Sequence, residues 1–268
     1  MCGFAAVVSN KPTDSHTLHK VASQLDHRGP SASGFHSFQF GTKYVSLAFK
    51  RLSILDVSPS ANQPFFSSCG NYILLFNGEI YNYVQLREKL SSLGFTFRTK
   101  SDTEVLLNSY IHYGRDVFSQ LEGMFAFVIF DLNLGCYILG RDLFGEKPLY
   151  IYEQPDLTII ASEQKAILAY PNVSAIPNVS HLFNKAFTQR HYSVESIFEG
   201  ITVFPASHYS VTPLTESTQL PLRYGRPFVR FGELNPYHNN FLLDSILYEL
   251  ESSFEQKYIN SDVPVALL

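Results

Sequence analysis

The order in which strand and helix patterns follow one another is the feature that most restricts how this sequence can fold. Strand-like segments dominate both before and after a central pair of helical segments in the first 161 residues. The expected strands are Phe4–Ser9, Gly34–Phe40, Tyr44–Phe49, Tyr72–Asn77, Phe125–Asp131, Cys136–Gly140, Leu149–Tyr152 and Leu157–Ala161. The expected helices are Leu18–Leu25, Tyr83–Leu93 and Thr103–Tyr113. Strands, then helices, then strands are typical of an α+β sandwich.

The last hundred residues have a different character. Residues 169–194 contain prolines and predict a loop, whereas Ile201–Val211 predicts a pair of strands. Residues 212–237 carry further prolines and predict a linker. Helical spacing returns over Phe241–Ile259, and Val263–Leu268 has the pattern of a buried strand.

Composition excludes several classes of protein. Hydrophobic residues make up 45% of the 268 positions and charged residues 16%, which excludes disorder driven by charge. A net charge of −4 argues against binding to nucleic acid. Three cysteines fit a reducing compartment, and neither a signal peptide nor an apolar run of about 18 residues is found. The sequence therefore predicts a cytoplasmic protein that binds neither nucleic acid nor a membrane.

Cys2 is the residue with the most chemical information. Removal of Met1 by an aminopeptidase would leave a chain that begins with a cysteine, which carries a thiol and a free α-amine. An α-amine has a pKa of about 7.7–8.0, which suits a general base near neutral pH. One residue could then supply both nucleophile and base. Most proteins with a cysteine at position two make no use of it, so this hypothesis needs support from other positions.

Asn77 and Gly78 follow an apolar strand and allow two interpretations. Asn-Gly is a strong turn signal, and a turn alone explains it. In the functional interpretation, the side-chain amide of Asn77 and the backbone N–H of Gly78 form an oxyanion hole. One such donor stabilises a transition state by roughly 2.7–4 kcal/mol.

Arg51 and Asp102 are candidate ligands for the two charged groups of an amino acid. An arginine at a strand end can bind a carboxylate through two hydrogen bonds, although a solvated surface arginine is the simpler interpretation. Asp102 stands in Ser101-Asp102-Thr103-Glu104, where its simpler role is to cap a helix. With Cys2, Asn77 and Gly78, these two residues describe a site for an amino-acid substrate.

Several short motifs carry a resemblance to a known family over roughly residues 2–210. In chain order they are Cys2-Gly3-Phe4, His27-Arg28-Gly29-Pro30, Arg51-Leu52-Ser53-Ile54, Gln63-Pro64, Asn77-Gly78-Glu79-Ile80-Tyr81-Asn82, Ser101-Asp102-Thr103-Glu104, Gly123-Met124-Phe125-Ala126-Phe127, Gly140-Arg141-Asp142 with Gly145 and Pro148-Leu149-Tyr150, and Ala161-Ser162-Glu163. Together they closely resemble the class II glutamine amidotransferase (glutaminase) domain of bacterial B-type asparagine synthetases. The resemblance implies an N-terminal-nucleophile fold, a four-layer α/β/β/α sandwich of two antiparallel sheets.

The same resemblance implies a reaction and a set of site residues. Cys2 would attack the side-chain amide of glutamine, ammonia would leave, and water would release glutamate from a thioester. Arg51 and Asp102 would hold the backbone groups of glutamine, and Asn77 with Gly78 would form the oxyanion hole. The pocket would also be lined by Leu52, Ser53, Ile54, Leu55 and Glu79. No metal site is expected.

Other residues in these motifs have simpler structural interpretations. His27 is expected to order a loop, because the α-amine already supplies the base. Arg141 and Asp142 are expected to fix the turn before Gly145. Cys69 and Cys136 are expected to be incidental thiols. Where many relatives carry a histidine, two positions before Arg51, this chain has Phe49, and we expect that change to affect packing more than chemistry.

The end of the chain also differs from the pattern of full-length asparagine synthetases. By resemblance, residues 2–211 are the glutaminase domain, 212–237 a proline-rich linker, and 238–268 the beginning of an ATP-dependent synthetase domain. The sequence stops where the phosphate loop Ser-Gly-Gly-x-Asp-Ser is expected. We therefore expect a truncated enzyme without a cofactor, since ATP and magnesium belong to the synthetase domain.

Three functional hypotheses remain open at this point. The first is the glutaminase part of a glutamine-hydrolysing asparagine synthetase, with glutamine as its substrate. The second is an amidotransferase part that supplies ammonia to an acceptor other than aspartate. The third is a non-catalytic product, such as a decayed fragment or a module that binds a separate synthetase subunit. The resemblance also allows a homodimer or a separate synthetase partner.

Overall fold

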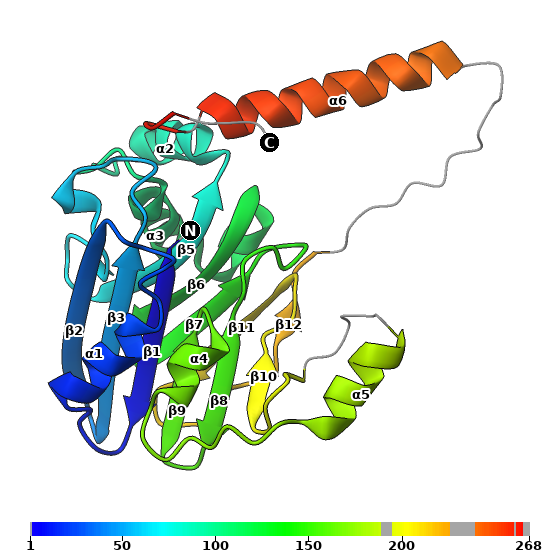
Figure 1. Cartoon of the computed structure of the whole chain (residues 1–268). Coiled ribbons are helices and arrows are strands. Elements are labelled where there is room, and N and C mark those ends of the chain that lie inside the picture. The colour runs from blue at the N-terminus through cyan, green and yellow to red at the C-terminus, as the bar shows by residue number, and fades with distance from the viewer. Residues whose placement is uncertain (1, 189–194, 226–238, 260, 265–268) are drawn as a thin grey trace.

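Two six-stranded antiparallel sheets face each other in the computed structural model, which describes residues 2–188, 195–225, 239–259 and 261–264 (Figure 1). The first sheet has the order β10 (Ile201–Val203), β8 (Tyr150–Gln154), β9 (Leu157–Ala161), β1 (Gly3–Ser9), β3 (Lys43–Arg51) and β2 (Ala32–Phe40). The second has the order β12 (Leu222–Arg223), β11 (His208–Pro213), β7 (Cys136–Arg141), β6 (Gly123–Asp131), β5 (Tyr72–Ile80) and β4 (Phe65–Phe66).

Helices cover the outer face of each sheet. The described helices are α1 (Ser15–Ser23), α2 (Tyr83–Ser92), α3 (Asp102–Tyr113), α4 (Gln164–Leu168), α5 (Val179–Thr188) and α6 (Asn239–Ile259), with 3₁₀ turns at Pro59–Ala61 and Gly114–Ser119. The apolar faces of α1 and α4 pack on the first sheet, and those of α2 and α3 pack on the second. The predicted α+β fold with four layers, α/β/β/α, is confirmed.

Side chains on alternating faces of β1 are covered from both sides, which explains why this strand is buried throughout. Phe4, Ala6 and Val8 point into the core between the sheets, while Ala5 and Val7 lie under α1 and α4. Both faces of the strand are covered, so all seven residues are buried and the sequence reads as a continuous apolar run. This burial fixes the position of Cys2, which immediately precedes the strand.

The structure departs from the sequence prediction at several places. A helix, α5, lies within residues 169–194, where we predicted a loop. The two strands of Ile201–Val211 exist, but they join different sheets instead of pairing with each other. The short strand β12 lies within the predicted linker. The strand predicted for Val263–Leu268 falls mostly outside the described residues, and Val263 and Pro264 are not in a strand.

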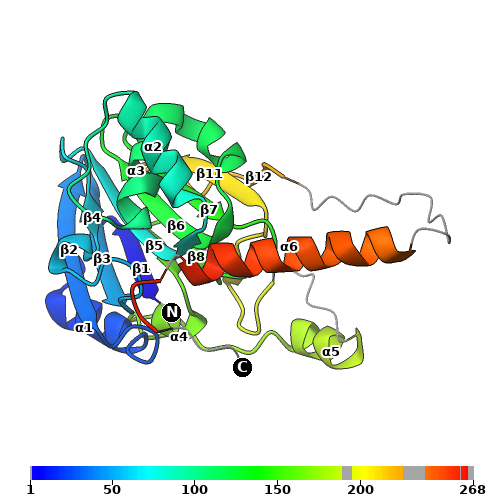
Figure 2. The same ribbon diagram turned by 90° about the horizontal axis from the view of Figure 1, so that it is seen from above.

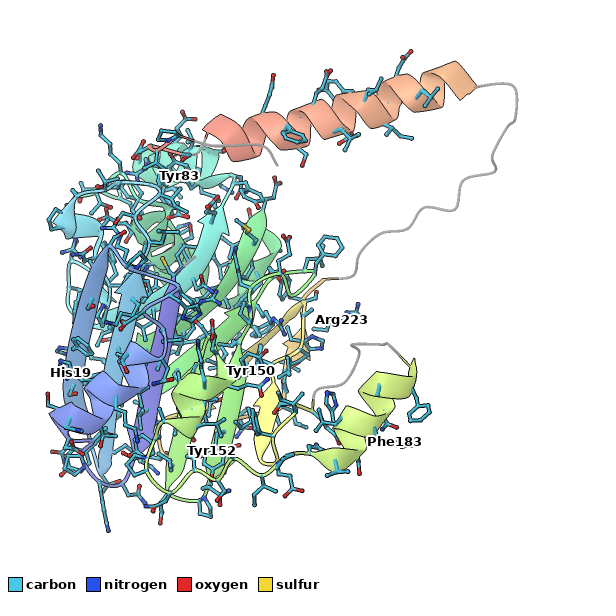
Figure 3. All side chains as sticks on the ribbon, in the orientation of Figure 1. His19, Tyr83, Tyr150, Tyr152, Phe183 and Arg223 are labelled. Carbon is cyan, nitrogen blue, oxygen red and sulfur yellow. The ribbon has the colours of Figure 1, made fainter. Side chains whose placement is uncertain are left out.

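Two helices project from the sandwich. Helix α5 extends away from the sheets, and Figure 3 shows its Phe183, which is 62% exposed, at a distance from the core. Helix α6 lies beside the sandwich at its C-terminal end and far from it at its N-terminal end (Figures 1 and 2). The part of the chain that the structure describes has no helix long and apolar enough to cross a membrane.

Candidate active site

Cys2 lies at the beginning of the central strand of the first sheet. Its Sγ atom accepts a hydrogen bond from the backbone N–H of Leu52 at 3.4 Å and lies 3.5 Å from the carbonyl oxygen of the same residue. Its backbone carbonyl accepts a hydrogen bond from Nε of Arg28 at 2.8 Å. The residue is therefore held both by its side chain and by its main chain, which sets the direction of the thiol.

The environment of Cys2 keeps the thiol protonated at rest. Burial raises its pKa, and the hydrogen bond from the backbone N–H of Leu52 opposes that effect. A neutral thiol is a poor nucleophile, because the thiolate is the reactive species. Reaction at this residue therefore requires a base within reach of Sγ.

The end of β5 supplies the polar wall of the pocket next to Cys2. Asn77 is 1% exposed, and neither Nδ2 nor Oδ1 of its side chain has a hydrogen-bond partner among the described residues. At Gly78, a Cβ atom would lie 2.2 Å from the carbonyl oxygen of Met124 on β6, so only glycine fits there. The pair lies within β5 and does not form the turn that Asn-Gly otherwise predicts. Buried amides without a partner are rare, and one that lines a pocket points to a ligand.

Gln63 holds the strand in register just before Asn77. Its Nε2 donates to the carbonyl oxygen of Phe76 at 3.1 Å, and its Oε1 accepts from the N–H of Phe76 at 2.6 Å. The side chain thus satisfies both main-chain groups of one strand residue, as a neighbouring strand would. The Gln63-Pro64 motif therefore supports the pocket wall.

Asp102 is the first residue of α3 and lies fully inside the protein. Ser101 is the N-cap, since its hydroxyl accepts from the N–H of Thr103, and Oδ2 of Asp102 accepts from the N–H of Ile80 at 3.0 Å. The Glu104 carboxylate accepts from the loop before the helix and so does not complete a reciprocal capping box. Burial raises the pKa of Asp102 to about 6, opposed by the hydrogen bond from Ile80.

Arg51 ends β3, and its guanidinium group is already bound to the loop that follows. One terminal nitrogen donates to the carbonyl of Ser58 at 2.8 Å and to Oδ1 of Asn62 at 2.7 Å. The other donates to the carbonyls of Leu55, at 3.3 Å, and Asp56. A carboxylate that binds both terminal nitrogens must displace one acceptor from each, whereas one that binds a single nitrogen displaces one acceptor.

These residues meet in one pocket on the sandwich. Of the residues predicted from the sequence, it is lined by Cys2, Arg51, Leu52, Ile54, Leu55, Asn77, Gly78, Glu79 and Asp102. Ser53 lies outside the lining, where its N–H donates to the hydroxyl of Ser31. The lining also includes residues that we did not predict, namely Gln63, Phe76, Ser101, Thr103, Met124 and Lys147.

Glu79 and Lys147 give the pocket opposite charges. Burial raises the pKa of Glu79 and lowers that of Lys147, and the attraction between the two groups opposes both shifts. Lys147 directly precedes the Pro148-Leu149-Tyr150 motif, and this position beside a motif is the sequence signal from which its place in the pocket could have been predicted.

The other motifs hold the loops around the pocket. His27 and Arg28 both bind Oε1 of Glu163, at 2.8 and 2.9 Å. The carboxylate of Asp142 accepts from backbone N–H groups of the turn that follows and from that of Phe125 on β6. Arg141 donates to carbonyls of the same turn. Phe49 is buried in the core between the sheets.

Comparison with known proteins identifies the family. The model for the glutamine amidotransferase domain family matches residues 1–223. This chain belongs to that family. Asparagine synthetase [glutamine-hydrolyzing] 1 of Bacillus subtilis (strain 168) is 38% identical over 80% of this chain and 34% of its own length. Asparagine synthetase [glutamine-hydrolyzing] 2 of the same strain is 30% identical over 100% of this chain and 36% of its own length. The amidotransferase chain thus spans about a third of the length of these relatives.

A solved structure supports the fold. The glutamine phosphoribosylpyrophosphate amidotransferase from B. subtilis, complexed with ADP and GMP, superposes with a TM-score of 0.60 at 19% identity. The match covers 85% of this chain and 50% of that one. At this identity the likeness concerns the fold alone, and it confirms the predicted N-terminal-nucleophile fold of this amidotransferase domain.

Proposed function

We propose that this glutamine amidotransferase hydrolyses glutamine to glutamate and ammonia through Cys2. The observation that carries the proposal is the buried amide of Asn77, which has no partner among the described residues and lines the same pocket as Cys2. A buried amide without a partner is costly unless a ligand satisfies it. An oxyanion that forms on the substrate would do so at the moment of reaction.

The chemical steps follow from the groups present. After removal of Met1, the α-amine of Cys2 takes the thiol proton, and the thiolate attacks the amide carbon of glutamine. Nδ2 of Asn77 and the backbone N–H of Gly78 stabilise the oxyanion that results. The protonated α-amine then gives its proton to the leaving nitrogen, and ammonia departs from a glutamyl thioester. Water, deprotonated by the α-amine, attacks the thioester, and glutamate leaves as the proton returns to sulfur.

The remaining groups orient the substrate. The Asp102 carboxylate pairs with the α-ammonium of glutamine. The α-carboxylate binds Arg51 and displaces the carbonyl of Leu55, because its 3.3 Å hydrogen bond is longer than those that Arg51 makes to Ser58 and Asn62. This exchange replaces a neutral acceptor with a charged one, which forms the stronger hydrogen bond.

Our proposal for how the ammonia is used rests on the names of the relatives. Because they are glutamine-hydrolysing asparagine synthetases, we propose that the acceptor is aspartate, activated by a synthetase domain. Residues 2–211 with strand β12 would then form the glutaminase unit, and 238–268 the beginning of the synthetase unit.

The direct test measures both products from glutamine. The chain is purified, loss of Met1 is established by intact mass, and glutamate and ammonia are determined over time. We expect the two products in equal amounts, with asparagine a much poorer substrate because its side-chain amide lies one methylene short of Cys2. A processed, folded chain that forms no glutamate would contradict the proposal.

Acidic pH should weaken glutamine binding. The pKa of Asp102 is about 6, so its charged fraction falls roughly tenfold per pH unit below that value. Only the carboxylate can pair with the α-ammonium, and kcat/KM for glutamine should therefore fall as the pH drops from 7 to 5. Initial rates across this range test the prediction. In Asp102→Asn, kcat/KM should already be low at pH 7, and its fall towards pH 5 should be less steep, because only protonation of the α-amine of Cys2 then contributes.

A further inference from the structure

Asp262, which follows helix α6, binds the loop that forms one wall of the pocket. Its backbone N–H donates to the carbonyl oxygen of Ile54 at 3.0 Å, and its Oδ2 accepts from the N–H of Asp56 at 2.7 Å. One residue thus holds both neighbours of Leu55. Figures 1 and 2 show that the C-terminal end of α6, which leads into this contact, is the end that lies beside the sandwich.

Asp56 connects this contact to Arg51. It has a positive φ of 49°, a conformation that few residues other than glycine adopt. Its carboxylate accepts from the N–H groups of Ser58 at 3.1 Å and Lys100 at 2.7 Å, and its carbonyl accepts from Arg51. The N–H of this residue thus binds Asp262 while its carbonyl binds the arginine of the pocket.

We propose that Asp262 is a positioning residue for glutamine binding, which it promotes by fixing the loop of residues 54–56 against Arg51. The inference rests on the proposed glutaminase function. Ile54 and Leu55 line the pocket, and the carbonyl of Leu55 is the acceptor that the substrate carboxylate displaces. With both neighbours of Leu55 held from outside, this displacement leaves the wall in place. A loop without that support must be ordered when glutamine binds, which weakens affinity.

The pocket wall is held by a segment that lies far from it in the sequence. Asp262 is 206 residues from Asp56 in sequence, and both of its hydrogen bonds end on main-chain atoms of the loop. Any movement of residues 261–264 away from the sandwich therefore changes how the pocket is held, without contact with the substrate itself.

The test compares three variants of the full chain. Asp262→Ala removes the side-chain acceptor, Asp262→Asn keeps an acceptor oxygen, and Asp244→Ala is the matched control, an exposed acid on α6. We expect Asp262→Ala to raise KM for glutamine about three- to tenfold, the effect of one lost hydrogen bond, with kcat within twofold of the parent. Asp262→Asn should recover most of the affinity, and Asp244→Ala should behave as the parent chain.

A binding measurement separates failure of this inference from failure of the proposed function. Calorimetric titration of glutamine into Cys2→Ala chains, with and without Asp262→Ala, reports affinity without turnover. An equal or lower Kd in the double variant overturns the role of Asp262. A parent chain that binds glutamine but never hydrolyses it overturns the proposed reaction, while the two Kd values still decide the role of Asp262.

Discussion

Replacement of Cys2 by alanine should abolish glutamate release from glutamine. The thiol is the proposed nucleophile, and no other cysteine lines the described pocket, so kcat should fall by at least about four orders of magnitude. Binding should persist, because Arg51 and Asp102 are unchanged. Initial rates of glutamate formation, with calorimetric titration of glutamine, measure both effects.

Cys69→Ala is the matched control for loss of a thiol. Cys69 is exposed in the turn between β4 and β5 and does not line the pocket, so its replacement should leave the rate unchanged. Glutamate release by Cys2→Ala at a rate close to that of Cys69→Ala would rule out the thioester mechanism.

Replacement of Asn77 by alanine should reduce kcat by about 10²- to 10³-fold. This is the usual effect of removing one donor from an oxyanion hole, roughly 2.7–4 kcal/mol of transition-state stabilisation. KM should change much less, since the donor acts on the charge that develops during reaction. Steady-state kinetics with glutamine separates the two parameters.

The stability of Asn77→Ala distinguishes this role from a structural one. Neither polar atom of the side chain has a partner among the described residues, so its removal breaks no hydrogen bond within that part of the chain. The thermal midpoint should therefore stay unchanged or rise. A large fall in the midpoint together with the loss of activity would show that Asn77 mainly supports the fold.

The long strands could be predicted from the sequence because their faces are apolar. The long helices could be predicted because apolar residues form a regular stripe along one side. Strand β1 and helix α3 are examples, and their predicted bounds differ from the structure by one residue at the start. The two-residue strands β4 and β12 carry too few side chains for a pattern. Helix α5 has apolar residues at helical spacing, from Val179 to Phe187, but the prolines at 171 and 177 favoured a loop in the prediction.

Most of the pocket could be predicted because its residues stand in short motifs that are weak signals singly but together resemble one family of glutaminase domains. The sequence did not show which polar side chains of the pocket are already hydrogen-bonded within the protein. Arg51 was predicted as a free carboxylate ligand, yet four acceptors from the following loop already bind it. That arrangement depends on the path of residues 52–62, which is set by tertiary contacts such as those of Asp56 and not by local propensity.

Trapping the covalent intermediate tests the central claim most directly. The chain without Met1 is mixed with glutamine, quenched in acid after a few milliseconds to seconds, and its intact mass and peptide masses are measured. We predict an added glutamyl group on the peptide that begins with Cys2, which is absent from Cys2→Ala and released by hydroxylamine. Steady glutamate formation with no adduct at any time, or an adduct on another residue, would contradict the mechanism.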